Sequence, residues 1–242
     1  TAALTLDADA RYAANGPSNA AFDVRVSDAA EVIEGLTGPV TVTGTASQAA
    51  NGAATLDVNG TGPGTVFALD AAIAAETQEV SGTLDASVAD LQVYRTLADM
   101  PLAGAIELQA SGKALQDLSR FDGTVAMAST DIETGNPSVD PLFIGAGTLQ
   151  ATAALTEAGL QVEQITAQYP NLQISGALDS SDGEGRGQFD ARLRDIGLVA
   201  DGITGPATAV GTATRGADGN WTVDASATAP GTTADINAAL TT

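Results

Sequence analysis

The feature that most constrains the fold of this chain is an alternation of apolar and polar residues that recurs along most of its length. Clear examples run through Phe22–Val26, Leu160–Glu163 and Phe189–Leu193. A period of two residues is typical of a β-strand with one apolar and one polar face. Because turn-forming pairs such as Asn51-Gly52 separate the alternating runs, the pattern predicts an all-β fold of many short antiparallel strands.

Other local signals mark where the strands are interrupted. Further turns are predicted at Asn59-Gly60 and Asp122-Gly123. Apolar residues at three-residue spacing predict one short helix within Ser87–Asp99, just before a proline. Two helical turns are also expected in each of Ser27–Gly35 and Lys113–Phe121. Helices are therefore expected to be few and short.

The charge balance and the missing residue types exclude several classes of function. The chain has 242 residues, with 30 acidic and 9 basic side chains, a net charge of -21, no His and no Cys. Ser-His-Asp and Cys-His relays, zinc sites with the usual ligands and disulfides are therefore impossible. Binding to nucleic acid is not expected, because phosphate contacts require Lys and Arg. We predict a protein that is not an enzyme, with no catalytic residues, no metal site and no cofactor.

Two loop sequences could be taken for binding sites, and neither is predicted to be one. The stretch Gly60–Gly64 is rich in glycine but lacks the lysine of a phosphate-binding loop, so it is interpreted as a turn. The stretch Asp179–Glu184 has carboxylates at a spacing that Ca²⁺ can use, but it is interpreted as a solvated hairpin tip.

The chain contains an internal repeat. Residues 21–73 align without a gap with residues 188–240, and a looser third copy covers residues 89–110. Repeated strand units predict a sheet that grows by addition, so residues 1–242 are expected to form one continuous repeat-built β segment. Asp23, Arg25 and Asp28 recur at the same spacing as Asp190, Arg192 and Asp195. We interpret them as a strand-end ion pair and a turn cap rather than as a binding site.

The apolar positions of successive strands in the second half of the chain are candidates for a ligand-binding floor. Hydrophobic residues make up 44% of the chain but aromatic residues only 4%, which suits a thin layer better than a thick core. The candidate residues are Leu149, Ala151, Ala153, Leu155, Leu160, Val162, Ile165, Leu172, Ile174, Leu178, Phe189 and Leu193. Periodicity alone allows two interpretations, the inner face of a closed sandwich or the floor of an open trough that accepts acyl chains.

The repeat motifs resemble those of a known family. An Asp, a Gly-Pro pair and a Gly-Thr-Ala strand, as in Asp195, Gly205-Pro206 and Gly211–Ala213, are followed by Asp218–Trp221 and Pro230–Ala234. The run Pro141–Leu149 and the run Ala191–Asp195 have the same character. This pattern is similar to the TamB and AsmA-like family, the translocation and assembly module subunits of Gram-negative bacteria.

The resemblance carries expectations about fold and location. It implies an elongated, curved antiparallel sheet that forms an open trough with an apolar interior, a β-taco-like groove. It also implies an inner-membrane anchor and a partner barrel of the outer-membrane insertase type, reached through a part of the protein that this chain lacks. We therefore expect an internal fragment of a periplasmic protein.

Two functions from different classes follow. The first is a segment of a periplasmic lipid-transfer bridge, which holds phospholipid acyl chains in the groove between the inner and the outer membrane. The alternative is a scaffold for outer-membrane protein assembly, whose sheet edges template incoming strands by β-augmentation. A Thr-rich adhesive or ice-binding surface is a more distant third, supported only by Thr41–Thr45. The cut sheet is also expected to associate end to end.

Overall fold

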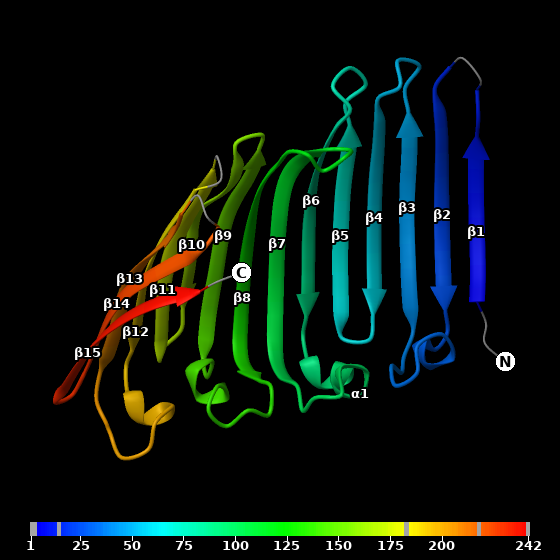
Figure 1. The fold of residues 1–242 in the computed structure, drawn as a ribbon. Helices are drawn as coiled ribbons and strands as arrows, with labels where there is room; N and C mark the ends of the chain where they lie inside the picture. The colour runs from blue at the N-terminus through cyan, green and yellow to red at the C-terminus, as the bar shows by residue number, and fades with distance from the viewer. Residues whose placement is uncertain (1–3, 14–15, 182–183, 217–218, 241–242) are drawn as a thin grey trace. The chain divides into compact units, whose positions relative to one another are not determined.

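The computed structural model describes residues 4–13, 16–181, 184–216 and 219–240, and it confirms the all-β class (Figure 1). The chain divides into two compact units, Thr1–Leu118 and Ser119–Thr242. Unit 1 contains β1 (Leu4–Arg11), β2 (Ser18–Val26), β3 (Val40–Gln48), β4 (Ala54–Gly62), β5 (Thr65–Ile73), β6 (Glu79–Val88) and β7 (Ala103–Leu115). Unit 2 contains β8 (Phe121–Glu133), β9 (Ala146–Thr156), β10 (Gly159–Gln168), β11 (Leu172–Ser181), β12 (Gly185–Leu193), β13 (Ala207–Arg215), β14 (Trp221–Ala229) and β15 (Thr232–Leu240).

Each unit is an open antiparallel meander. Every strand pairs with the strand that follows it in the chain, from β1 to β7 in unit 1 and from β8 to β15 in unit 2. Short connections between sequential strands favour this order, because each hairpin closes locally. The strands therefore follow one another across each sheet in chain order (Figure 1).

The register separates apolar from polar side chains onto two faces. In unit 1 one row runs across the strands through Leu6, Val24, Val42, Gly60, Phe67, Ala86 and Leu108. In unit 2 the corresponding kind of row runs through Val125, Ala151, Ile165, Gly176, Phe189, Gly211, Ala225 and Ile236. Residues that pair directly across strands share a face, so each sheet has one apolar side.

The helical predictions are confirmed in part. The segment Ser87–Asp99 contains a 3-10 helix, η2 (Leu91–Tyr94), followed by α1 (Arg95–Ala98). Residues 27–35 hold only one 3-10 turn, η1 (Ala29–Glu31). Two further 3-10 turns, η3 (Asp140–Leu142) and η4 (Ile196–Leu198), follow β8 and β12.

Three local predictions are wrong. Residues 113–121 are not helical, because β7 extends to Leu115, where its backbone pairs with Glu79 of β6. Asn59-Gly60 and Asp122-Gly123 lie inside β4 and β8 rather than in turns. Cross-strand pairing overrides the local turn preference at these positions. The tip of the hairpin at Asp179–Glu184 includes residues 182 and 183, which lie outside the described residues.

The repeat copies have the same loop architecture. In the first copy the Asp28 carboxylate accepts hydrogen bonds from the backbone N–H groups of Ala30 (3.1 Å) and Gly38 (2.9 Å). In the second copy Asp195 accepts the equivalent bonds from Gly197 (2.9 Å) and Gly205 (2.8 Å). Each aspartate thus caps a 3-10 turn and closes the loop that returns to the next strand.

Two further observations extend this likeness. Arg25 pairs with Asp23 on β2, and Arg192 pairs with Asp190 on β12 at 3.0 Å. Asp90, in the looser third copy, caps η2 through the N–H of Gln92 at 2.9 Å. The ion pairs and turn caps predicted for the first and second repeat copies are therefore present in the structure.

The small buried cluster of unit 2 lies at the strand ends rather than between layers. In unit 2 Ala167, Tyr169 and Leu172 are buried and pack against Phe143 near η3. The rings of Phe143 and Tyr169 meet edge to face, with centroids 4.9 Å apart, and the Tyr169 hydroxyl lies 2.7 Å from the hydroxyl of Ser129. No described side chain of large volume is completely buried anywhere in the chain. The described residues of each unit therefore form no sandwich core between two sheets.

Candidate functional site

The candidate floor residues of unit 2 lie together on the apolar face. Leu160 pairs with Leu155, Val162 pairs with both Ala153 and Leu178, and the remaining strands continue the same rows. The cross-strand register therefore places all of the candidate residues named from the sequence on one side of β9–β12: Leu149, Ala151, Ala153, Leu155, Leu160, Val162, Ile165, Leu172, Ile174, Leu178, Phe189 and Leu193.

A β-bulge in β10 makes this arrangement possible. Val162 and Ile165 are three residues apart, a spacing that places side chains on opposite faces of a regular strand. The register shifts between them, so Glu163 and Gln164 occupy the bulge while Val162 faces Leu178 and Ile165 faces Gly176. The bulge returns the apolar side chains to a common face.

Three of the candidate residues are exposed, eight are half-buried and one, at the end of the face, is buried. Ile165 is 40% exposed, Ile174 37% and Phe189 37%, values that no closed sandwich core would give. Leu172, in contrast, is only 8% exposed, because it belongs to the end cluster with Tyr169, and Leu193 packs against that cluster. The candidate residues therefore include an open stretch, with Ile165, Ile174 and Phe189, and a structural end, formed by Leu172 and Leu193.

Unit 1 has an apolar face that was not named among the candidate residues. A hollow of about 590 Å³ lies on it and is lined mainly by the apolar side of β1–β6, including Ala20, Ala46, Leu56, Ile73 and Val80. This volume is within the range of small-molecule sites, and its lining is almost entirely apolar. Apolar and polar residues alternate along β2, β3 and β4, and this pattern is the sequence signal from which the face could have been predicted.

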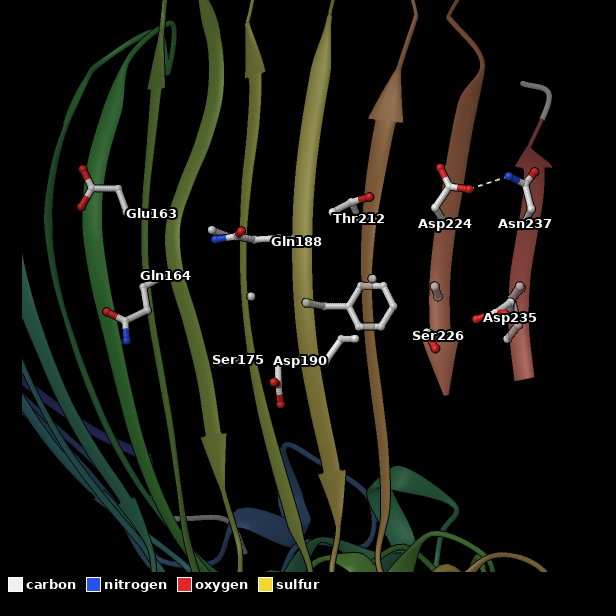
Figure 2. Close-up of a pocket in the computed structure, with 17 residues that line it drawn as sticks. Glu163, Gln164, Ser175, Gln188, Asp190, Thr212, Asp224, Ser226, Asp235 and Asn237 are labelled. Carbon is white, nitrogen blue, oxygen red and sulfur yellow. Dashed lines mark hydrogen bonds between the residues drawn. The ribbon is translucent and has the colours of Figure 1, made fainter. Parts of the chain in front are cut away.

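A second hollow, of about 980 Å³, lies over β10–β15 in unit 2 and has a different character. Most of its lining side chains belong to the polar rows, and Figure 2 shows Gln188, Thr212 and Asp224 on adjacent strands. Asp224 also accepts a hydrogen bond from the side-chain amide of Asn237. Carboxylates and amides of this kind are strongly hydrated, so an acyl chain fits this hollow poorly.

Pairs of an aromatic ring and a glycine shape the apolar face in both units. The ring of Phe22 covers Gly44, and the ring of Phe189 covers Gly211, at equivalent positions of the two repeat copies. Phe67 covers Gly60 in the same manner, and a Cβ atom added at Gly60 would lie 2.1 Å from its ring. Each ring thus occupies the space above a glycine of the neighbouring strand and adds apolar area to the face.

The shifted pKa values among the described residues belong to aspartates that accept hydrogen bonds from backbone N–H groups. Hydrogen bonds from the N–H groups of Gly38 and Ala30 hold the pKa of Asp28 below its ordinary value, and those of Gly205 and Gly197 do the same for Asp195. The pKa of Asp140 is lowered chiefly by the N–H of Thr134. The described residues contain no group of three or more acidic side chains arranged to hold a metal ion. None of their helices is both long and apolar enough to cross a membrane.

The chain was compared with protein-family models, with curated proteins and with solved structures, and none of the three comparisons found a match. The expected membership of the TamB and AsmA-like family is therefore carried by the sequence motifs alone.

Proposed function

We propose that this chain binds the acyl chains of phospholipids on its apolar face and is a segment of a periplasmic lipid-transfer bridge. The observation that carries the proposal is the open apolar face, with an almost purely apolar hollow of about 590 Å³ in unit 1. Soluble proteins rarely leave continuous apolar surface uncovered unless it binds a partner or a ligand.

The energetics favour a flexible hydrocarbon ligand. Each methylene that leaves water contributes about 0.8 kcal/mol, so an acyl chain gains affinity from length without any polar anchor. Alanine, glycine and a few larger apolar side chains make up most of the rows of this face, with few polar side chains among them. Such a surface allows a chain to slide along it, as transfer requires, and the proposal needs no covalent chemistry.

A matched pair of substitutions on β6 tests the proposal. Val80 lines the apolar hollow, whereas Ser81 is exposed on the opposite face of the same strand. Protein expressed in a Gram-negative host should retain phospholipid in native mass spectrometry. Val80→Asp should reduce that retention about tenfold, since it places a charge against the acyl chain, and Ser81→Asp should leave it unchanged. Equal retention in both variants, or no phospholipid in the parent protein, would contradict the proposal.

The open sheet edges favour a second candidate, a scaffold that templates strands of outer-membrane proteins. Within the described residues, β1 pairs only with β2, and β15 pairs only with β14. Each therefore exposes a row of backbone groups that an incoming strand can bind. Cross-linking of an added outer-membrane strand to β15, with no phospholipid bound, would favour this candidate over lipid transfer.

A further inference from the structure

The apolar hollow of unit 1 and the equivalent strand ends of unit 2 are crossed by corresponding rows of residues. The alignment of residues 21–73 with residues 188–240 extends in the same register to Ser18 and Gly185. Backbone pairing joins one row of four residues across β2–β5 and an equivalent row across β12–β15. The equivalent members are Ser18 and Gly185, Gln48 and Arg215, Ala54 and Trp221, and Ile73 and Leu240. All four members in unit 1 line the hollow.

The position of Ala54 and Trp221 is filled differently in the two copies. In unit 1, Ala54 leaves space above the sheet, and the hollow of about 590 Å³ lies there. In unit 2, the indole of Trp221 reaches across β13 to Gly185 of β12, where an added Cβ atom would lie 2.7 Å from Cη2 of the ring. Gly185 is accordingly buried. The side chain of Trp221 therefore covers in unit 2 the row that is open in unit 1.

The residue beneath the ring differs together with the ring. Gly185 has no side chain, and the ring of Trp221 occupies the space that a Cβ atom would need. Its counterpart Ser18 has a side chain, and the hydroxyl oxygen accepts a hydrogen bond from the N–H of Ala13 at 3.2 Å. Other apolar lining positions of these strands differ by at most one carbon atom: Ala20 and Gly187, Ala46 and Ala213, Leu56 and Val223, and Ala71 and Ala238. The exchange of Ala54 for Trp221 is therefore the main change in apolar volume here.

We propose that Trp221 determines where the apolar faces bind a ligand. Its ring closes the strand ends of unit 2, whereas Ala54 leaves the equivalent ends of unit 1 open to an acyl chain. The occupant is a hydrocarbon chain, because the group that covers the equivalent row in unit 2 is itself apolar and lies on a similar lining. An aromatic side chain buries about 150–250 Å² of surface, so its ring and a ligand compete for the same area. This inference rests on the proposed lipid binding and specifies where on the chain it occurs.

Transfer of the tryptophan and glycine pair to unit 1 gives the first test. The probe is N-phenyl-1-naphthylamine, which is uncharged at neutral pH, is not repelled by the net charge of -21, and emits more strongly in apolar surroundings. Ser18→Gly combined with Ala54→Trp should weaken its binding about tenfold, the loss expected when about two methylene equivalents lose their contact. Ala72→Trp makes the same change on the opposite face of the neighbouring strand, outside the hollow, and should leave binding unchanged. A folded transfer variant that binds the probe as tightly as the parent protein would refute the inference.

Removal of the ring from unit 2 gives the reverse test. Trp221→Ala should raise the amount of probe bound at saturation to about twice the parent value, because an apolar cavity left by a large side chain accepts apolar ligands. Trp221→Phe retains a ring and should gain less. Thr222→Ala, on the exposed opposite face of β14, should bind as the parent protein does. Circular dichroism establishes that each variant is folded. No gain in Trp221→Ala, or an equal gain in Trp221→Phe, would overturn the role of the ring.

The two tests separate this inference from the proposed function. If the parent protein binds no probe but Trp221→Ala does, the ring closes a site and its role stands, whereas the proposed binding to the parent protein fails. If the parent protein binds the probe and neither the transfer nor the removal alters binding, the proposed function stands and this inference fails. Absence of binding in the parent protein and in every variant would overturn both.

Discussion

The repeat copies β2–β5 and β12–β15 share a set of structural contacts, which we call the frame. They differ in the side chains of their apolar face. Both retain the aspartate loop cap, the Asp–Arg pair and the phenylalanine over a glycine. The face itself is reduced in unit 2, where alanine replaces Val24, Val42, Val58 and Phe67 at positions 191, 209, 225 and 234. The two copies therefore share their loop caps, ion pairs and ring–glycine contact while the size of their apolar side chains differs.

One of these replacements is coupled to another. Phe67 lies over Gly60 in unit 1, and the corresponding residues of unit 2 are Ala234 and Ala227. A glycine is required beneath a ring because a Cβ atom would overlap it, and the requirement ends when the ring is absent. The two positions therefore differ together between the copies, which is the result expected when a contact across strands restricts the residue type.

The largest expected effect separates the structural end of the unit 2 face from its open stretch. Leu172→Asp should destabilise unit 2 by about 3 kcal/mol or more, because it places a charge in the buried cluster of Tyr169 and Phe143. Ile174→Asp, two residues along the same face and 37% exposed, should cost about 1 kcal/mol or less. Chemical denaturation followed by circular dichroism measures both. Similar large losses in the two variants would show that the face is covered.

The next largest expected effect is a loss of stability that tests the contact between Phe67 and Gly60. Gly60→Ala should destabilise unit 1 by about 1 to 3 kcal/mol, because the new Cβ atom overlaps the Phe67 ring. Adding Phe67→Ala should recover part of that loss, since the double variant reproduces the alanine pair of unit 2. A double-mutant cycle from equilibrium denaturation gives the coupling. Additive losses would mean that the ring does not restrict the glycine.

A smaller effect tests whether the frame is equivalent in the two copies. Asp28→Ala and Asp195→Ala each remove two hydrogen bonds from a loop cap, and each should lower the melting temperature by a few degrees. Asn at either position retains an acceptor oxygen and should preserve most of the stability. If calorimetry finds that one aspartate matters and the other does not, the two frames are not equivalent.

The smallest expected effect is the acid sensitivity that these aspartates add. Their pKa values are lowered in the folded state by backbone N–H donors, so their contribution is present above the ordinary aspartate pKa. It is lost as the pH falls through the lowered folded-state pKa, that is, below about pH 4. The combined Asp28→Asn and Asp195→Asn variant should therefore lose less stability between pH 5 and pH 3, about the range of this titration, than the parent protein. An unchanged pH profile of the melting temperature would exclude this contribution.

The sequence by itself determined which side chains share a face within a regular strand and which loops repeat. Alternation is a local property of an extended chain, so Leu172, Ile174 and Leu178 were located on one side of their strand without knowledge of its neighbours. The caps at Asp28 and Asp195 followed in the same way, because the bonds of a turn cap form with residues nearby in the chain.

Only the tertiary structure decided whether that face is covered, because coverage depends on contacts between residues far apart in the sequence. It placed Leu172 in a closed end and left Ile174 open, although both have the same local pattern. The tertiary structure also contains the bulge that brings Val162 and Ile165 to one face, and it places Asn59-Gly60 inside a strand. In each case the free energy of pairing with neighbouring strands outweighs a local preference, and that free energy cannot be obtained from a short stretch of sequence.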